Sequence, residues 1–159
     1  MSWTIDRVSS EQDLDEIVEI EAASFSSPWT RQMYVRELEN PDVSFLYVLR
    51  LAQDGRDAIV GFCSFWLLLD EVHINNLAVR PECRGRGYGG KLLGHVLGVG
   101  AERGARRATL EVRRSNGPAL RLYQRFGFEI AAARRNYYVG PSEDALILWR
   151  NESRPASGA

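Results

Sequence analysis

Seven consecutive residues, Arg84-Gly85-Arg86-Gly87-Tyr88-Gly89-Gly90, have the composition of an anion-binding turn. They stand between a predicted strand, residues 71–80, and a predicted helix, residues 88–103. Glycine lets the backbone approach a ligand closely and adopt a positive φ. The unpaired N–H groups in the first turn of a helix, together with the helix dipole, favour phosphate. Because two arginines add positive charge, we expect this turn to bind a phosphate group.

The spacing of the glycines also matches a dinucleotide-binding pattern. Gly85, Gly87 and Gly90 fit G-x-G-x-x-G, and Glu111 stands where a ribose-binding acid is expected. However, residues 80–84 separate the strand from the first glycine, and too little chain follows for two βαβαβ halves. The glycines are not followed by Lys-Ser or Lys-Thr, which excludes a P-loop. A nicotinamide site is therefore disfavoured.

Glu111 and Tyr123 form a second candidate for chemistry. Glu111 lies at the centre of a predicted strand, residues 107–113, on the same side as Thr109 and Arg113. Tyr123 falls in a predicted helix, residues 116–126. If both face one cleft, they could serve as general base and general acid. The residues alone also fit an exposed ion pair for Glu111 and a packing role for Tyr123.

At these positions the sequence resembles a known family. Arg84-x-x-Gly87-x-Gly89 is similar to the R/Q-x-x-G-x-G/A signature of the GCN5-related N-acetyltransferase (GNAT) superfamily. A narrower resemblance, to the RimI type, covers most of the chain from about Ile5 to Trp149. It is carried by residues 24–25, 28–29, 76–79, 110–113, 115–116, 119, 122–123, 126–128, 134–138 and 143–145.

The resemblance implies a role for each matching position. Acetyl-CoA would be bound by Leu77, Ala78, Val79, Arg84, Gly85, Arg86, Gly87, Tyr88, Gly89, Gly90, Asn116 and Tyr123. Glu111 would act as general base and Tyr123 as general acid. Tyr137, Tyr138 and Asn75 would contact the substrate peptide, although core packing fits the two tyrosines equally well. Arg113 would keep Glu111 ionised if their side chains meet.

The implied reaction is direct transfer of an acetyl group to a protein N-terminal amine. Within the RimI type, the acceptor is the N-terminal alanine of small-subunit ribosomal protein eighteen, so we expect a basic N-terminal peptide as partner. Two alternatives stay open. One is the same fold acting on other protein N-termini, lysine side chains or a small amine. The other is a non-catalytic acyl-CoA-binding or ribosome-associated module.

The order of predicted elements indicates an α/β domain. A short first strand, two helices and a hairpin of residues 45–51 and 58–69 precede strand–helix–strand–helix–strand, which requires some parallel pairing. Ser9 with Gln12 resembles a capping box, and Thr30 is a predicted N-cap. With the resemblance, we expect a GNAT three-layer fold, a mixed sheet of about seven strands flanked by four helices. Residues 1–150 would form one domain and residues 151–159 a flexible tail.

Composition limits the remaining possibilities. The chain has 159 residues, 45% of them hydrophobic and 26% charged, which is typical of one globular domain. Its two cysteines exclude a disulfide framework, and no apolar stretch is long enough to span a bilayer. We therefore expect a cytoplasmic protein that binds neither membrane nor nucleic acid, with a monomer favoured. Cys63, His73, Cys83 and His95 are spaced too widely for a zinc pair, so no metal is expected.

Charge is unevenly distributed along the chain. Residues 1–79 hold 5 Lys/Arg against 14 Asp/Glu, whereas residues 80–135 hold 13 against 4. The basic segment contains the predicted phosphate-binding turn. The acidic segment contains early helices that flank the acceptor groove in the resembled fold, so Glu37, Glu39 and Asp42 could attract a basic N-terminus.

Overall fold

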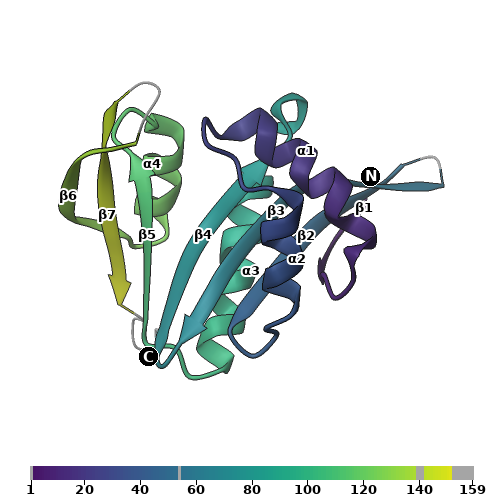
Figure 1. The fold of residues 1–159 in the computed structure, drawn as a ribbon, viewed down its shortest axis with the longest axis horizontal. Helices are drawn as coiled ribbons and strands as arrows, with labels where there is room; N and C mark the ends of the chain where they lie inside the picture. Colours follow the sequence, from purple (N-terminus) through teal and green to yellow (C-terminus); the bar gives the residue numbers. More distant parts are fainter. Residues whose placement is uncertain (1, 54, 139–141, 152–159) are drawn as a thin grey trace.

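The computed structural model describes residues 2–53, 55–138 and 142–151, and within them seven strands form one mixed sheet (Figure 1). The order across the sheet is β1-β2-β3-β4-β5-β7-β6. The strands are β1 Ser2–Arg7, β2 Ser44–Gln53, β3 Arg56–Leu68, β4 Glu71–Val79, β5 Arg107–Arg113, β6 Glu129–Tyr138 and β7 Glu143–Asn151. Neighbouring strands are antiparallel except β4 and β5, which are parallel, so the predicted mixed sheet is confirmed. Of the predicted tail, residues 151–159, only Asn151 lies within the described residues, as the last residue of β7.

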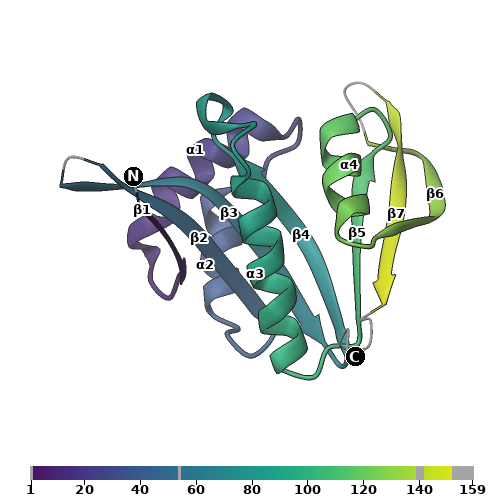
Figure 2. The same ribbon diagram turned by 180° about the vertical axis from the view of Figure 1, so that it is seen from behind.

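Helices cover both faces of the sheet and complete the predicted three layers (Figures 1 and 2). The α-helices are α1 Leu14–Ser24, α2 Arg31–Leu38, α3 Tyr88–Glu102 and α4 Gly117–Arg125, with short 3-10 helices at Glu11–Asp13 and Pro81–Cys83. One hydrophobic core lies between the sheet and α1–α2, and a second lies between the sheet and α3–α4. No described helix is long and apolar enough to cross a membrane.

The two predicted N-terminal caps have different outcomes. Thr30 caps α2 as predicted, because its hydroxyl accepts a hydrogen bond from the Met33 N–H at 3.2 Å. The predicted capping box at Ser9 and Gln12 is wrong, and no side chain caps this helix start. Val8 is still bonded to the sheet, its N–H donating to Leu46 O at 2.8 Å. The chain therefore turns later than the pattern suggested and enters α1 through a 3-10 turn.

β4 and β5 pair over only four residues before they separate. Their register runs from Glu71 opposite Arg107 to Ile74 opposite Leu110, and beyond it the two strands diverge (Figure 1). The separation starts at a bulge, because β3 pairs with Ile74 and then with Asn76, which leaves Asn75 as the extra residue.

The bulge also reverses the two faces of β4. Val72 and Ile74 pack in the core beneath α3, whereas Ala78 packs in the core beneath α1 and α2. In an unbroken strand these three positions would share one face. The bulge therefore directs the amide of Asn76 toward α1 at the point where the sheet opens.

Candidate active site

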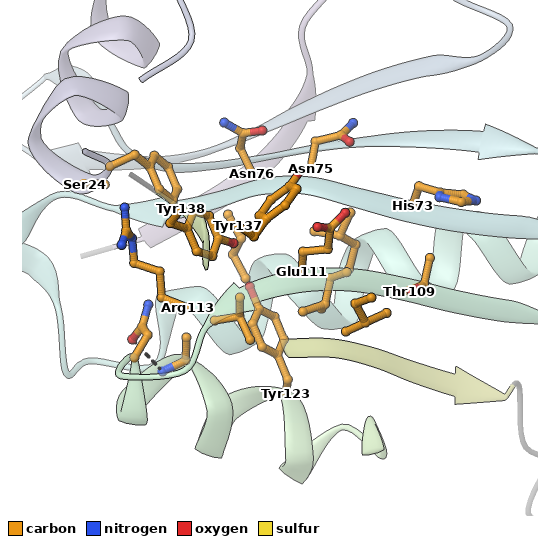
Figure 3. A pocket seen from close by; sticks show the side chains of 18 of the residues that line it. Ser24, His73, Asn75, Asn76, Thr109, Glu111, Arg113, Tyr123, Tyr137 and Tyr138 are labelled. Atoms are coloured by element: carbon orange, nitrogen blue, oxygen red, sulfur yellow. Dashed lines mark hydrogen bonds between the residues drawn. The ribbon is translucent and has the colours of Figure 1, made fainter. Parts of the chain in front are cut away.

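Beyond the pair Ile74–Leu110, β4 and β5 separate, and we call the gap between them the split. A cavity of about 950 Å³ lies at the split. It is lined by residues from α1, the α1–α2 loop, α4 and strands β3 to β7 (Figure 3). Of the predicted site residues, it brings together Asn75, Leu77, Glu111, Asn116, Tyr123, Tyr137 and Tyr138. The remaining ones lie at the end of β4 and in the turn that leads into α3.

Glu111 is exposed on the side of β5 that faces the α1–α2 layer, opposite its buried neighbours Leu110 and Val112. The sequence suggested Arg113 as its partner, but Arg113 forms an ion pair with Glu143 at 3.2 Å. The arginine paired with Glu111 is Arg134 of β6, whose Nη1 lies 3.9 Å from Oε2. This pairing could not be read locally, because it depends on how β6 folds over the sheet.

Tyr123 approaches the cavity from the opposite layer. Its ring is 7% exposed and packs edge-on against Phe128, with 5.7 Å between ring centroids. Figure 3 shows its hydroxyl directed toward the split from α4. Burial raises the pKa of Tyr123 well above its ordinary value, so the phenol keeps its proton at physiological pH. The packing interpretation and the cavity interpretation of Tyr123 therefore both hold.

Two tyrosines of β6 form the wall near Glu111. Tyr137 and Tyr138 pack edge-on with 5.2 Å between centroids, and the guanidinium of Arg113 lies 4.3 Å from the ring centroid of Tyr138. Burial, with the neighbouring Glu111 carboxylate, raises the pKa of Tyr138 to about 12. Arg113 also donates a hydrogen bond to Ser26, so it links β5 to the α1–α2 loop beside this wall.

The glycine-rich turn has the backbone that its sequence predicts. Gly85 and Gly87 have φ of +79° and +86°, and a Cβ at either position would meet no atom within 4 Å. Glycine is therefore needed for the dihedral angle, since space is available. Gly87 is the N-cap of α3 and has no side chain to cap it, so the N–H groups of residues 88–90 lack partners within the helix. Arg86 is exposed at the same turn.

Within the described residues, Arg84 makes hydrogen bonds with neutral groups of the chain, which leave its positive charge uncompensated at the turn. Its Nε donates to Val79 O at 2.9 Å, its Nη2 donates to Ser24 Oγ at 3.1 Å, and its N–H donates to Pro81 O at 3.3 Å. The side chain thus ties the turn to β4 and α1. Arg84 therefore helps to shape the turn, and the residues after it carry the N–H groups that lack partners within the helix.

The edge of β4 beside the split is available to a ligand. Arg80 N–H donates to Val60 O on β3 at 2.7 Å. Because successive residues of a strand direct their backbone groups to opposite edges, Val79 and Leu77 direct theirs away from β3 and into the split. Ala78 directs its backbone groups toward β3, and its side chain is buried in the α1–α2 core. Leu77 and Val79 therefore carry the open backbone edge.

Asn116 stands at the N-terminus of α4 and lines the same cavity. Its Oδ1 accepts a hydrogen bond from Ala119 N–H at 3.2 Å, which caps the helix. This bond fixes the amide orientation and leaves Nδ2 as the group that can donate to a ligand.

Glu21 is a cavity residue that the sequence interpretation missed. Its carboxylate is 1% exposed and accepts hydrogen bonds from three neutral groups, Trp29 N–H at 2.9 Å, Tyr34 O–H at 2.5 Å and Asn76 Nδ2 at 2.8 and 3.0 Å. These bonds hold the α1–α2 loop against β4. The available signal was an acid on the apolar stripe of α1, in step with Leu14 and Ile17.

Three aromatic side chains that the sequence interpretation did not place in the site also line the cavity. Trp66, His73 and Trp149 lie along its floor, on the same face of the sheet as Glu111. Within the described parts of the chain, no group of three or more His, Cys, Asp or Glu side chains could hold a metal ion.

Comparisons with known proteins agree with this geometry. The acetyltransferase (GNAT) family matches residues 14–128. A Bacillus subtilis protein provisionally named ribosomal protein bS18-alanine N-acetyltransferase is 42% identical over 87% of this chain and 89% of its own. The crystal structure of the ribosomal-protein-S18-alanine N-acetyltransferase from Escherichia coli superimposes with a TM-score of 0.83 at 31% identity, covering 96% of each chain.

A more distant structure shows the fold alone. The NatC complex bound to Gag peptide and CoA has a TM-score of 0.84 at 22% identity, covering 96% of this chain and 100% of that chain. The family match covers most of the chain, and the two relatives exceed 30% identity over nearly their whole length. This chain therefore belongs to the acetyltransferase (GNAT) family.

Proposed function

We propose that this protein transfers the acetyl group of acetyl-CoA to the N-terminal amine of a protein, with the N-terminal alanine of ribosomal protein bS18 as the acceptor. One observation carries the proposal. Glu111 reaches the split between β4 and β5 from the α1–α2 side, and Tyr123 reaches it from the α4 side. An amine and a thioester that meet in the split would thus have a base on one side and an acid on the other.

The residues around the split fit acetyl-CoA. The open backbone edge of Leu77 and Val79 could pair with the amide groups of the pantetheine arm as an added strand. The N–H groups at the start of α3 could hold the pyrophosphate. Asn116 Nδ2 could donate a hydrogen bond between these two regions. When bound, the co-substrate supplies the reactive acetyl thioester.

The chain's own residues would manage the two protons. An α-amine with a pKa of about 7.7–8.0 is mostly protonated at neutral pH and must lose a proton before it attacks. Glu111 would accept that proton, directly or through water, and the amine would form a C–N bond as the C–S bond breaks. Tyr123, which keeps its proton because burial raises its pKa, would protonate the leaving thiolate.

The test uses an alanine-starting basic peptide, acetyl-CoA and a thiol-release assay. Replacing Glu111 by Gln, or Tyr123 by Phe, should lower kcat by about 10²- to 10⁴-fold, the usual contribution of a general acid or base. Glu102→Gln, at the exposed C-terminal end of α3, is the matched control and should keep full activity. Mass spectrometry should place the acetyl group on the α-amine, which distinguishes this acceptor from lysine.

The pH profile gives a second readout. The raised pKa of Tyr123 implies that the wild-type kcat does not fall up to pH 10 through loss of this proton. Full activity in the Glu111→Gln, Tyr123→Phe double variant would refute the assigned roles. The proposal includes a basic ribosomal-protein N-terminus as partner and the cytoplasm as location. Mass spectrometry of ribosomal proteins from cells lacking the chain would check the partner, because the acceptor should then lack its acetyl group.

A further inference from the structure

Four side chains form a continuous row across the floor of the cavity. We call them the cross-strand row, Trp66, His73, Thr109 and Trp149. Each is paired with the next in the register of β3, β4, β5 and β7. Their sequence neighbours Phe65, Val72, Ala108 and Leu148 pack in the core beneath α3 and α4. Because side chains alternate along a strand, the cross-strand row faces the α1–α2 side, as Glu111 does.

The row lies within reach of an acceptor peptide. Glu111 is two residues beyond Thr109, and Trp66 is two strands away from Thr109. With strands 4.7–4.9 Å apart and about 3.3 Å per residue, Trp66 lies about 12 Å from Glu111 along the sheet. An extended peptide whose amine is at Glu111 would therefore bring its third or fourth residue over Trp66.

Two carboxylates hold the rings of this row. Glu37 Oε1 of α2 accepts a hydrogen bond from Trp66 Nε1 at 2.6 Å, and Glu71 Oε1 lies 3.0 Å from His73 Nε2. A carboxylate that accepts the indole N–H adds negative charge at the edge of the ring. The row thus has an aromatic surface with an acidic group at two points.

The two ends of the row differ in how that charge is compensated. At the Trp149 end, the guanidinium of Arg107 lies 5.1 Å from the ring centroid and forms an ion pair with Glu71. At the Trp66 end, the described residues place no cation over the ring or beside Glu37. At one end of the row, Trp149 and Glu71 together bind the cation of Arg107. At the other end, Trp66 and Glu37 are the same two residue types, and the described residues supply no cation to them.

We propose that Trp66 and Glu37 form a subsite for the guanidinium or ammonium group of the third or fourth residue of the acceptor. The proposal rests on the proposed function and names a sequence preference within it. A cation over an indole face is attracted by the ring quadrupole, and the nearby carboxylate adds a Coulomb attraction. Of the acids that the sequence suggested for this purpose, only Glu37 bonds to a residue lining the cavity, since Glu39 and Asp42 are exposed elsewhere.

The experiment compares two peptides that both start with alanine and differ only at residues three and four, which are arginine in one and glutamine in the other. The enzymes are the wild type, Glu37→Gln and the matched control Glu39→Gln. Glutamine at position 37 keeps an oxygen that can accept the Trp66 N–H, so this variant removes the charge while retaining the bond. Equal thermal midpoints for the three proteins would confirm that the fold is intact.

For the wild type and Glu39→Gln, we expect a KM about tenfold lower for the arginine peptide, with equal kcat and equal KM for acetyl-CoA. In Glu37→Gln most of this difference should disappear, and in the wild type it should shrink as salt rises. An unchanged preference in Glu37→Gln would overturn the subsite while leaving the proposed function in place. If the wild type acetylates neither peptide, the proposed function fails, and the subsite fails with it.

Discussion

Replacing Gly100 by alanine should destabilise the protein, whereas the same replacement at Gly98, two residues earlier in α3, should stabilise it. A Cβ at Gly100 would lie 2.5 Å from Val72 Cγ2, while a Cβ at Gly98 would meet no atom within 4 Å. Ordinary carbon–carbon contacts are about 3.5–4.0 Å long, so α3 or Val72 would have to move by roughly 1 Å.

The magnitudes follow from this difference in space. Alanine in a helix interior is favoured over glycine by about 0.5–1 kcal/mol, which is the gain expected at Gly98. At Gly100 that gain is opposed by overpacking, which costs about 1–3 kcal/mol. A change of 1 kcal/mol shifts the Tm of a domain this size by about 2–4 °C. We therefore expect a Tm up to about 10 °C lower for Gly100→Ala and about 1–4 °C higher for Gly98→Ala.

Thermal unfolding followed by circular dichroism measures both variants. Gly100→Ala should cost less stability when it is introduced into a Val72→Ala protein than when it is introduced into the wild type. The reason is that the smaller side chain at position 72 makes room for the new methyl group. Val72 lies in the short paired stretch of β4 and β5 that ends at the split, so the clash should also raise the KM of the peptide slightly. A Gly100→Ala protein as stable as Gly98→Ala would refute the packing argument.

Two further substitutions test how the site is held. Glu21→Gln places an amide N–H₂ group among the donors of Trp29, Tyr34 and Asn76, so it should lower stability by about 1–3 kcal/mol. Because the α1–α2 loop loosens, peptide KM should rise while the Kd for acetyl-CoA stays constant, and unchanged peptide KM would contradict this. Gly87→Ala forces a side chain into φ +86°, at a cost of about 1–2 kcal/mol. It should weaken acetyl-CoA binding in isothermal titration, and an unaltered Kd would show that the turn does not hold the cofactor.

Local pattern was enough for most of the elements and for part of the site. Strand β5 has the predicted bounds, residues 107–113, because alternating burial has a period of two that one segment carries by itself. Thr30 was identified as a cap because its hydroxyl bonds to a group three residues away. The glycine-rich turn was expected to use the freedom of glycine to adopt a positive φ, and Gly85 and Gly87 do so.

Residues that depend on distant partners could not be placed in this way. Arg113 was expected beside Glu111, but it binds Glu143 and Ser26, which lie 30 and 87 residues away. Glu21 binds Asn76 across 55 residues, and its role was invisible without that contact. The contact of Arg84 with Ser24, 60 residues away, was equally out of reach of local pattern.

Local sequence patterns were enough to predict the α/β class and the glycine-rich turn, and they include the acid and the tyrosine that the family resemblance singles out. These features depend on periodicity, on φ requirements and on short motifs, all of which lie within a few residues of one another. Contacts between distant segments set where the sheet opens, which arginine approaches Glu111 and how the cross-strand row crosses the floor. Those features depend on the register between strands and on one bulge at Asn75, where a shift of a single residue exchanges the two faces of β4.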